Sequence, residues 1–326
     1  MTSNDTPLVS ILIRSMDRPT LQRALDSAAR QTWPNLEIVV VAACGDVHRP
    51  LPDQHNGRPL RLINSGEKLT RPMAANAALD AALGEWLNFL DDDDELLPEH
   101  VRTLMSAPRP SGERVVFSRT RVIDANGKTL GHVSHAGNRV QLFTHSRATV
   151  DAMLFHRSLV DEGARFDPAF LAHEDHDFQV NCATRTDFVF VNRATAIWHA
   201  QLGESGSGFG GNDDRQQRAD AIRAIRAKWS STFDEWLRDF DDVLFTGQQY
   251  LKGGDVPAAR RCLEVALALR PRDVNALNLC GMANFHTGNI DRAEQLLTIA
   301  LHRAPDNRLL QENLALIQAR RAAAVR

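Results

Sequence analysis

Short apolar runs alternate with amphipathic segments over the first two thirds of the 326-residue chain. Apolar runs of about 4–8 residues are typical of buried strands, whereas apolar residues spaced by three or four positions indicate helices. The expected strands are Leu8–Ile13, Leu36–Val41, Leu60–Asn64 and Trp86–Leu90. The expected helices are Pro19–Gln31 and Pro72–Leu83. This alternation predicts an α/β fold with a parallel sheet, in which ligands bind beyond the carboxyl ends of the strands.

The last third of the chain carries a repeat with an offset of 34 residues. The matched pairs are Gly247 and Gly281, Gly254 and Gly288, Ala259 and Ala293, Leu263 and Leu297, Ala266 and Ala300, and Pro271 and Pro305. Glycines favour turns between helices, and proline ends the second helix of each unit. This pattern resembles the tetratricopeptide repeat. It implies an all-α domain of two units over residues 243–326, closed by a capping helix at Asn307–Arg321.

A solenoid needs about three repeat units to bury its own core, and this chain has two. We therefore expect residues 213–242, whose apolar residues recur at helical spacing, to form a helical packing segment. The Gly-rich stretch Gly203–Asp213 is interpreted either as a flexible linker or as a loop that closes over a ligand. The expected catalytic or binding domain covers residues 1–212.

The charge and composition of the chain argue against several classes of protein, among them nucleic-acid-binding and membrane-spanning proteins. The net charge of −3 gives no general electrostatic reason to bind nucleic acid or an anionic membrane. The longest apolar run, Ile38–Cys44, is far shorter than the ~20 residues of a membrane-spanning helix, and the N-terminus has no signal-peptide pattern. Four scattered cysteines without a Cys-x-x-Cys pair are typical of a reduced, cytoplasmic protein.

Four consecutive carboxylates, Asp91–Asp94, directly follow the apolar residues Phe89 and Leu90. Adjacent carboxylates repel one another and raise each other's pKa unless a cation lies among them. Hard divalent cations prefer carboxylate oxygens and leave coordination positions for water and phosphate. The run therefore indicates a metal or ligand site at a strand end, with an acidic turn that caps the next helix as the structural alternative.

Three segments resemble family 2 glycosyltransferases with the GT-A fold, over roughly residues 7–205. They are the opening Val9–Gly45, the segment Ala74–Asp94 that ends in the acidic run, and Gly163–Phe178, which contains Glu174 and Asp175. The resemblance implies a GT-A catalytic domain with a Rossmann-like, mixed sheet. It also implies an inverting transfer of a sugar from a nucleoside diphosphate sugar to an acceptor hydroxyl.

The same resemblance assigns the acidic run to the donor and its metal. Asp91 would contact the donor ribose and share the metal, Asp93 would ligate Mn²⁺ or Mg²⁺, and Asp92 would help to bind the donor. The metal would neutralise charge on the leaving diphosphate. His199, at the end of an expected strand, would be the third metal ligand, since imidazole suits Mn²⁺ tolerably. The other histidines that offer an alternative metal cluster are His132, His135, His173 and His176.

Asp175 falls on the position of the family's catalytic base, and Glu174 would orient it or bind the acceptor. A carboxylate opposite the leaving group can take the proton of an acceptor hydroxyl as the new bond forms. The alternative is that these acidic residues only begin a helix, where they favour its N-terminal dipole. Further donor-binding residues are expected at Ser15, Asp17, Arg71 and Asn76.

The nucleotide-base pocket departs from the family pattern. Arg14-Ser-Met-Asp17 stands where the family has Pro-Thr-Tyr-Asn, and Ala42–Gly45 stands where it commonly has Asp-Asp-Gly-Ser. Asp17 or Asp46 would have to replace the missing acidic residue, so a UDP-sugar is the donor only by default. A degenerate transferase domain that serves as a binding scaffold is the rival interpretation. A nucleotidyltransferase is a third, but it leaves the Glu174-Asp175 pair unexplained.

The acceptor expected from the resemblance is a surface glycan or a lipid-linked glycan. Tetratricopeptide repeats form concave surfaces that bind extended segments, so a protein or peptide acceptor is a further alternative. The repeats are also expected to bind a protein partner or to mediate self-association.

Overall fold

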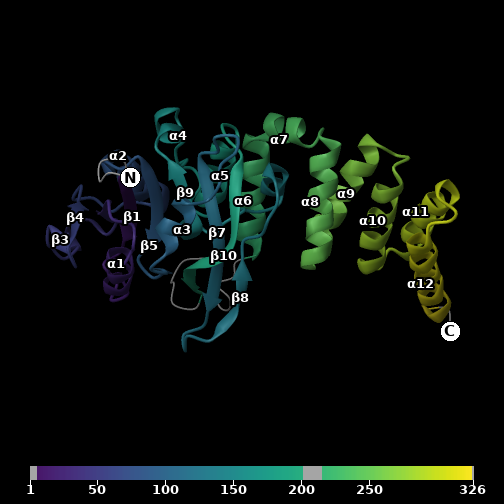
Figure 1. Cartoon of the computed structure of the whole chain (residues 1–326), viewed down its shortest axis with the longest axis horizontal. Coiled ribbons are helices and arrows are strands. Elements are labelled where there is room, and N and C mark those ends of the chain that lie inside the picture. The colour runs from purple at the N-terminus through teal and green to yellow at the C-terminus, as the bar shows by residue number, and fades with distance from the viewer. Residues whose placement is uncertain (1–5, 201–214, 325–326) are drawn as a thin grey trace. The chain divides into compact units, whose positions relative to one another are not determined.

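One mixed sheet organises the N-terminal part of the protein, in the strand order β3-β4-β2-β1-β5-β9-β7-β10-β6, with β8 paired to β7 (Figure 1). The computed structural model describes residues 6–200 and 215–324. It contains two compact units, Met1–Lys228 and Trp229–Arg326. The strands are β1 (Val9–Ser15), β2 (Leu36–Ala42), β3 (Gln54–His55), β4 (Arg58–Ile63), β5 (Trp86–Asp91), β6 (Glu95–Leu96), β7 (Val115–Ile123), β8 (Thr129–Val133), β9 (Met153–His156) and β10 (Phe188–His199).

Short helices connect these strands in the first unit. The α-helices are α1 (Leu21–Ala29), α2 (Arg71–Ala81), α3 (His100–Met105), α4 (Ser158–Asp161), α5 (Glu174–Ala183) and α6 (Arg215–Lys228). The 3₁₀ helices are η1 (Gly45–Val47), η2 (Arg139–Phe143) and η3 (Val150–Ala152). The Gly-rich stretch Gly203–Asp213 lies outside the described residues.

The register of β1 brings two chemically important residues together. β1 lies between β2 and β5 and runs parallel to both, so that Ile11 is opposite Ile38 on one side and Asn88 on the other. In the same register Arg14 is opposite Asp91, the last residue of β5. β9 runs antiparallel to β5 and β7, whereas β10 runs parallel to β7. The sheet is therefore mixed, as expected for the GT-A fold.

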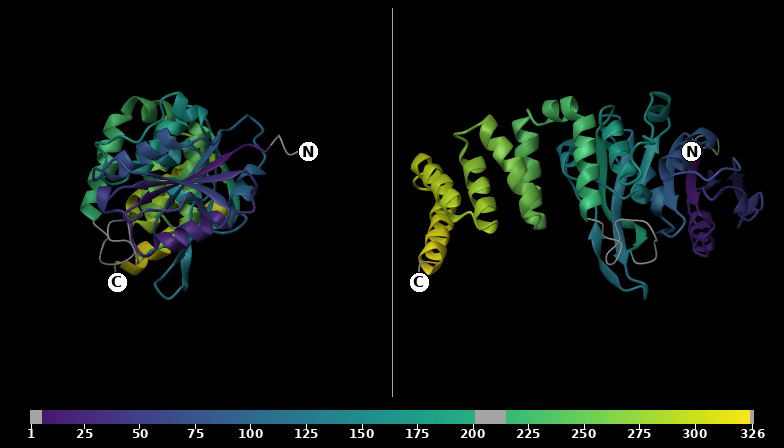
Figure 2. Two further views of the ribbon diagram at one scale, coloured as in Figure 1. Left: turned by 90° about the vertical axis from the view of Figure 1, so that its left-hand side faces the viewer. Right: turned by 180° about the vertical axis from the view of Figure 1, so that it is seen from behind.

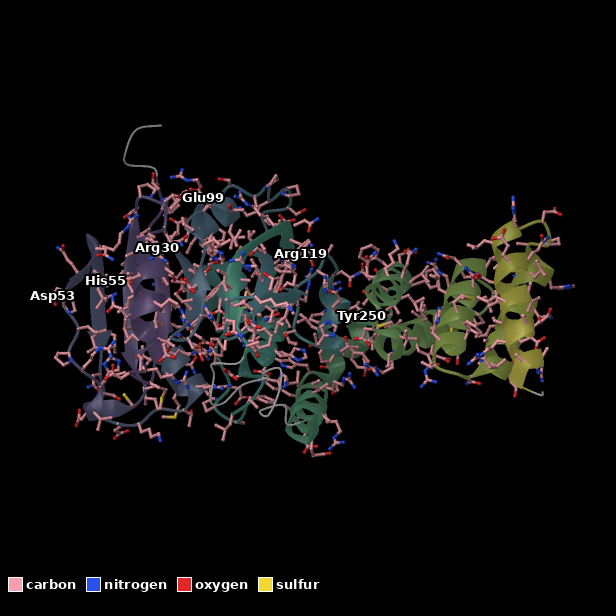
Figure 3. All side chains as sticks on the ribbon, turned by 90° about the horizontal axis from the view of Figure 1, so that it is seen from below. Arg30, Asp53, His55, Glu99, Arg119 and Tyr250 are labelled. Carbon is pink, nitrogen blue, oxygen red and sulfur yellow. The ribbon has the colours of Figure 1, made fainter. Side chains whose placement is uncertain are left out.

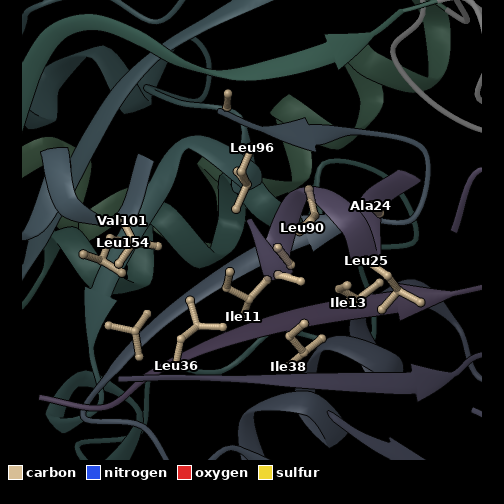
Figure 4. Close-up of a cluster of buried hydrophobic side chains, with 14 of the residues drawn as sticks. Ile11, Ile13, Ala24, Leu25, Leu36, Ile38, Leu90, Leu96, Val101 and Leu154 are labelled. Carbon is tan, nitrogen blue, oxygen red and sulfur yellow. The ribbon is translucent and has the colours of Figure 1, made fainter. Parts of the chain in front are cut away.

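Helix α1 covers one face of the central strands because its apolar residues recur at three- and four-residue spacing. Leu21, Ala24 and Leu25 are buried and belong to one cluster with Ile11 and Ile13 of β1 (Figure 4). Burial of a leucine side chain contributes about 1.5–3 kcal/mol, and truncation of a buried leucine to alanine costs about 2–5 kcal/mol. This packing fixes the end of β1, which carries Arg14 and the loop that follows.

Aromatic rings on the opposite face fix the position of α5. Phe178 of α5 stacks on Phe166 with ring centroids 4.2 Å apart, and it meets the ring of Phe155 on β9 edge-on at 5.3 Å. Phe89 of β5 contacts both Phe155 and Phe166. Offset and edge-to-face aromatic pairs contribute about 0.5–1.5 kcal/mol beyond their buried area. The acidic first turn of α5 is thereby held beside the end of β5.

Helix α6 packs on the first unit through its last turn. Lys228 Nζ lies 2.8 Å from Asp177 Oδ2 and 2.8 Å from Asp167 Oδ2. Arg226 donates from Nε to the carbonyl oxygen of Phe143 at 2.6 Å. Within the described residues of the expected packing segment 213–242, residues 215–242 are mostly helical. The boundary between the two compact units falls among them, after Lys228.

The second unit consists of helices that follow one another along the chain (Figure 2). They are α7 (Ser230–Trp236), α8 (Phe240–Gly253), α9 (Val256–Leu269), α10 (Val274–His286), α11 (Ile290–Arg303) and α12 (Arg308–Ala324). Asp239, Asp255 and Asp273 cap α8, α9 and α10 with their side chains, and each accepts a backbone N–H of the first turn. In the part of the chain that the structure describes, no helix is long and apolar enough to cross a membrane.

The repeated glycines explain why the helices of each unit approach so closely. A Cβ atom on Gly247 would lie 2.6 Å from Cγ of Leu263, and one on Gly281 would lie 2.0 Å from Cδ2 of Leu297. Gly254, with φ of +82°, ends α8 in the left-handed region that glycine adopts most readily. These helix pairs confirm the expected tetratricopeptide architecture.

Candidate active site

The acidic run lies where β5 ends and turns into β6. Asp91 is the last residue of β5, and Asp92–Asp94 form the turn that follows. Carboxylate oxygens of Asp91, Asp93 and Asp94 all lie within 4.8 Å of one another, and no other such group of possible metal ligands occurs in residues 6–200 and 215–324. Three carboxylates at this spacing fit a hard divalent cation, which prefers oxygen ligands.

Arg14 joins this cluster to the first turn of α5. Its Nη2 and Nε atoms lie 2.6 and 3.0 Å from Asp91 Oδ1, and its Nη1 atom lies 2.8 Å from Glu174 Oε1. The side chains of Arg14 and Glu174 are only 9% and 4% exposed. A nearly buried guanidinium that forks between two carboxylates is a strong, directional contact. It places the two acidic motifs of the sequence, which are 80 residues apart, in one site.

Asp92 is not one of the three clustered carboxylates and contacts the loop after β1. Its Oδ2 atom accepts the backbone N–H of Met16 at 2.8 Å, and its Oδ1 atom lies 3.0 Å from Arg18 Nη1. The same Arg18 nitrogen lies 3.2 Å from Asp93 Oδ2. Burial raises the pKa of Asp92 to about 6, although the Met16 N–H and Arg18 favour its ionised form. Asp92 therefore shapes the loop that the resemblance assigns to the donor base.

Burial and mutual repulsion also raise the pKa values of the clustered carboxylates. The pKa of Asp94 lies well above its ordinary value because the group is buried and lies near Asp151, Asp93 and Asp91. The pKa of Asp93 is raised by burial and by Asp91, and Arg18 opposes the shift. A divalent cation bound among these carboxylates would lower their pKa values again and keep all of them ionised.

Asp151 is a supporting carboxylate that the sequence did not reveal. It lies in η3, and its Oδ1 atom accepts the backbone N–H of Asp91 at 2.9 Å. Its backbone oxygen accepts a hydrogen bond from Nδ2 of Asn88, whose Oδ1 atom lies 2.8 Å from Nε2 of the buried His100. Burial, and then the charge of Asp91, raises the pKa of Asp151 to about 7. No motif surrounds Asp151 in the sequence, so only the fold could identify it.

The start of α5 lies beside the acidic turn and carries Glu174 and Asp175, which the resemblance assigns to the acceptor side. His173 precedes the helix in the left-handed region, with φ of +57°, and Asp17 in the opposite loop has φ of +59°. Non-glycine residues in this region cost about 1–3 kcal/mol each and occur preferentially at functional sites. Glu174 is buried against Arg14, whereas Asp175 is half-buried. Burial raises the pKa of Glu174, and Arg14 opposes the shift.

The imidazole of His199 does not join the acidic cluster. Its Nε2 atom lies 2.8 Å from Glu95 Oε1, and its backbone N–H donates to Asp94 Oδ1 at 2.8 Å. Burial lowers the pKa of His199, and Glu95 opposes the shift. Arg23 lies 3.3 Å from the same Glu95 oxygen. His199 thus contacts the acidic turn through its backbone, and its side chain would have to leave Glu95 to reach a metal.

The other expected donor residues have different surroundings. Ser15 is buried, and its Oγ atom lies 2.8 Å from His48 Nε2 and accepts the N–H of Asp17 at 3.0 Å. Asp17 accepts the N–H of Arg49 at 2.9 Å and pairs with its guanidinium at 2.5 Å. These contacts order the loop after β1, from which Asp17 reaches across to Arg49.

The two donor residues expected on α2 differ from each other. Arg71, at the start of α2, lies near enough to Asp93 and Glu174 for its charge to oppose the rise in the pKa of both groups. Asn76 lies further along the helix, and its amide donates to the carbonyl oxygen of Phe166 at 2.8 Å and accepts the N–H of Phe166 at 3.0 Å. The structure therefore brings Arg71 into the site and uses the amide of Asn76 to hold the segment before α5.

The histidines weighed as an alternative metal cluster do not form one. His176 is buried, with Nε2 2.7 Å from the carbonyl oxygen of Leu142, and burial lowers its pKa to about 3. His132 lies on β8, opposite Arg121 of β7. In the described chain, only the carboxylates of the acidic turn come close enough together to hold an ion.

A mixed sheet with an acidic turn after its central parallel strand and a second acidic motif beside it defines a GT-A glycosyltransferase domain. Residues 10–163 match the profile of glycosyl transferase family 2, and residues 246–308 match a tetratricopeptide repeat profile. Residues 10–163 therefore carry a glycosyl transferase family 2 domain, and residues 246–308 carry tetratricopeptide repeats.

Curated relatives agree with this family. The chain is 26% identical over 177 residues to the succinoglycan biosynthesis protein ExoO of Rhizobium meliloti. The matched segment covers 48% of this chain and 50% of that protein. It is 24% identical over 185 residues to the amylovoran biosynthesis glycosyltransferase AmsB of Erwinia amylovora, over 51% of this chain and 60% of the relative. The matches thus span half to three fifths of these relatives.

Solved structures share the fold. The protein TarS of S. aureus, residues 1–349 in complex with UDP-GlcNAc, has a TM-score of 0.50 at 13% identity, over 97% of this chain and 92% of that one. The mannosyltransferase PcManGT of Pyrobaculum calidifontis, in complex with GDP-Man and Mn²⁺, has a TM-score of 0.51 at 16% identity, over 99% and 87%. At these identities the likeness shows the GT-A fold alone.

Proposed function

We propose that this chain is a metal-dependent, inverting glycosyltransferase that moves a sugar from a nucleoside diphosphate sugar to an acceptor hydroxyl. The observation that carries the proposal is the contact of Arg14 with both Asp91 and Glu174. It places a cluster of carboxylates suited to a cation directly beside a second acidic motif. A UDP-sugar is the default donor, and a surface or lipid-linked glycan is the proposed acceptor.

The carboxylates of Asp91, Asp93 and Asp94 would hold Mn²⁺ or Mg²⁺. When bound, the ion supplies positive charge for the diphosphate that leaves with the nucleoside. Arg71 adds a second cation on the same side, since its charge acts on both Asp93 and Glu174. An arginine can pair with two phosphate oxygens at once. Together these groups would bind the diphosphate and orient its sugar towards α5.

Asp175 is the proposed base. The neighbouring Glu174 is nearly buried and its Oε1 atom is paired with Arg14 at 2.8 Å, so Glu174 is suited to position the helix start rather than to accept a proton. Asp175 is more exposed and can meet an acceptor hydroxyl. It would take the hydroxyl proton as oxygen attacks the anomeric carbon opposite the leaving diphosphate. A single displacement of this kind inverts the anomeric centre.

The loop after β1 would bind the nucleoside. Asp92, Ser15 and Asp17 order this loop through the contacts with Met16, His48 and Arg49 described above. The proposed role of Asp91 at the donor ribose requires one of its oxygens to face away from Arg14, which contacts only Oδ1. His199 remains a proposed third metal ligand whose side chain would exchange Glu95 for the ion.

The repeats would recruit a protein partner, a peptide acceptor or a second copy of the chain. A cytoplasmic location stays a prediction, and it agrees with four free cysteines. The alternative function is a degenerate transferase domain that serves the repeats as a scaffold. The departures from the family pattern at Ser15 and Met16 are the observation that favours it.

One assay separates the two functions. Purified protein is mixed with a panel of nucleoside diphosphate sugars, with and without Mn²⁺, and released nucleoside diphosphate is measured. The proposed enzyme releases it from at least one donor, and release depends on the metal and on Asp93. A scaffold releases none from any donor, and its rate equals that of the Asp93→Ala variant.

A further inference from the structure

Two arginines on β7 lie on one face of the sheet, and among the described residues neither has a carboxylate partner. Arg119 and Arg121 are two positions apart on one strand, so their side chains leave the same face of the sheet, about 6–7 Å apart at the backbone. Both residues are half-buried, and the Nε atom of each is buried without a hydrogen-bond partner. In the described chain neither guanidinium forms an ion pair. Arg119 is labelled in Figure 3.

The hairpin strand β8 adds further donors beside them. His132 is opposite Arg121 and Val133 is opposite Thr120 in the β7–β8 register, and Ser134 directly follows the end of β8 on the side of Arg119. Ser134 is only 8% exposed, its φ is +72°, and its Oγ atom has no hydrogen-bond partner. Partial burial and the charge of Arg119 lower the pKa of His135. The cluster therefore consists of hydrogen-bond donors and positive charge, with no acidic group among them.

This cluster lies on the acceptor side of the sheet. Phe117 shares its face of β7 with Arg119, and it is opposite Met153 of β9, two residues before Phe155, whose ring contacts Phe178 of α5. The arginines thus lie on the sheet face that α5 covers. Along the strand, Arg121 is opposite Ile197 of β10, two residues before His199, whose N–H binds Asp94. A ligand held by the arginines would therefore extend towards the acidic turn.

Arginine stays protonated at every physiological pH. Two guanidinium groups that leave one face of a strand two residues apart, with no carboxylate between them, therefore repel each other. Burial of their Nε donors without partners adds a cost of about 1–3 kcal/mol for each group. An anion with several oxygens would remove both penalties, because guanidinium groups bind phosphate through paired hydrogen bonds. A carboxylate offers fewer oxygens than the two arginines and Ser134 can use together.

We propose that Arg119, Arg121 and Ser134 form a subsite for a phosphate group attached to the acceptor. The inference rests on the proposed transferase function and narrows its acceptor to a phosphate-bearing glycan. The phosphate sits on the sheet face beside α5, and the hydroxyl that receives the sugar extends from it towards Asp175. The phosphate can belong to a sugar phosphate or to the diphosphate of a lipid-linked glycan, since both offer the same oxygens.

The first test measures binding of inorganic phosphate to the full chain by calorimetry, in EDTA so that no metal can bind phosphate on the donor side. The Arg119→Gln/Arg121→Gln double variant is compared with Arg193→Gln, which removes an exposed arginine on β10. Phosphate binding is expected to weaken at least tenfold in the double variant and to stay unchanged in Arg193→Gln. An Arg71→Gln variant removes any phosphate held on the donor side, and the phosphate binding that depends on Arg119 and Arg121 is expected to persist in it.

Thermal unfolding separates this role from a structural one. Phosphate should raise the melting temperature of the unmodified protein but not that of the double variant. In phosphate-free buffer the double variant should melt at the same temperature or higher, because one charge repulsion is gone. Equal phosphate binding in the double variant and the unmodified protein overturns the proposal, as does loss of phosphate binding in Arg71→Gln alone.

The second test compares neutral oligosaccharides with their phosphomonoesters and with short-chain lipid diphosphate sugars as acceptors. A lower KM for a phosphate-bearing acceptor, abolished in the double variant with donor hydrolysis unchanged, supports the subsite and identifies the source of the phosphate. Equal KM values for neutral and phosphate-bearing acceptors overturn it. If no donor is ever hydrolysed, the transferase function fails, and the calorimetry still decides whether the anion site exists.

Discussion

Nη1 of Arg14 lies 2.8 Å from Oε1 of Glu174, although 160 residues separate them in the chain. Through this contact, the end of β1 fixes the distance between the acidic turn after β5 and the start of α5. The acidic turn and the start of α5 are thus connected by one nearly buried side chain.

We expect Arg14→Met to destabilise the protein and to abolish transfer. Removal of one partner from a buried ion pair leaves an uncompensated charge and costs about 3–5 kcal/mol. Urea unfolding and the rate of transfer measure the two effects. The Arg14→Met/Glu174→Gln double variant should regain part of the stability, because its effects are coupled through one contact. Additive losses in the double variant would argue against the bridge.

Removal of the metal should abolish release of nucleoside diphosphate. The three clustered carboxylates need a cation before the diphosphate can approach them. EDTA, or Asp93→Asn, is expected to reduce donor binding in calorimetry to background, and added Mn²⁺ should restore it only in the EDTA-treated protein. Asp53→Asn, which alters an exposed aspartate, is the matched control. Full turnover in EDTA would contradict the metal site and the role of His199.

Asp175→Asn should slow transfer by about 10²–10⁴-fold, the usual effect of a lost general base. The amide keeps the shape of the carboxylate but cannot take the hydroxyl proton. Donor binding should persist, because Asp175 faces the acceptor, and calorimetry with the donor checks this. Near-normal transfer by Asp175→Asn would assign the base to another residue, and Glu174→Gln is the variant to compare.

The metal-free protein should become less stable as the pH rises from about 4 towards 7. The folded pKa of Asp151 is about 7, above its ordinary value of 3.8, so the folded state binds the proton more tightly than the unfolded state. The contribution of Asp151 to stability is therefore fully present below about pH 4 and is lost as Asp151 ionises towards pH 7, by a few kcal/mol. Asp151→Asn keeps an acceptor for the Asp91 N–H and should make the fall in melting temperature over this range less steep. An unchanged slope would contradict the assignment.

Gly247→Val should unfold the repeat unit at lower denaturant concentration without altering donor hydrolysis. The new side chain would meet Leu263 at the 2.6 Å approach, and such overpacking costs about 1–3 kcal/mol. Gly253→Ala is the matched control on the same helix, where a Cβ atom has open space. Alanine in a helix is more stable than glycine by about 1 kcal/mol, so this control should be neutral or stabilising. Circular dichroism with urea and the hydrolysis assay give the two readouts.

Local patterns predicted much of the fold. The apolar run Leu36–Val41 became β2, and the run Trp86–Leu90 became β5 with one more residue, Asp91. The segment Asn307–Arg321 became α12 at Arg308–Ala324. These elements bury one face or both faces, and their hydrophobic period alone specifies them. The short strands β6, β8 and β9 carried no such period, because neighbouring strands decide their pairing.

The sequence by itself determined the class of protein, the two acidic motifs and the repeats, because each is a run of residues whose spacing has a local physical meaning. Only the tertiary structure decided the partners of these motifs. Arg14 and Asp151 are single residues without a surrounding pattern, and their contacts with Glu174 and Asp91 depend on the register of β1 and the position of η3. The side chain of Asn76 and that of His199 were likewise placed by long-range contacts, with Phe166 and Glu95. Contacts between residues far apart in the chain arise from packing, which no local pattern records.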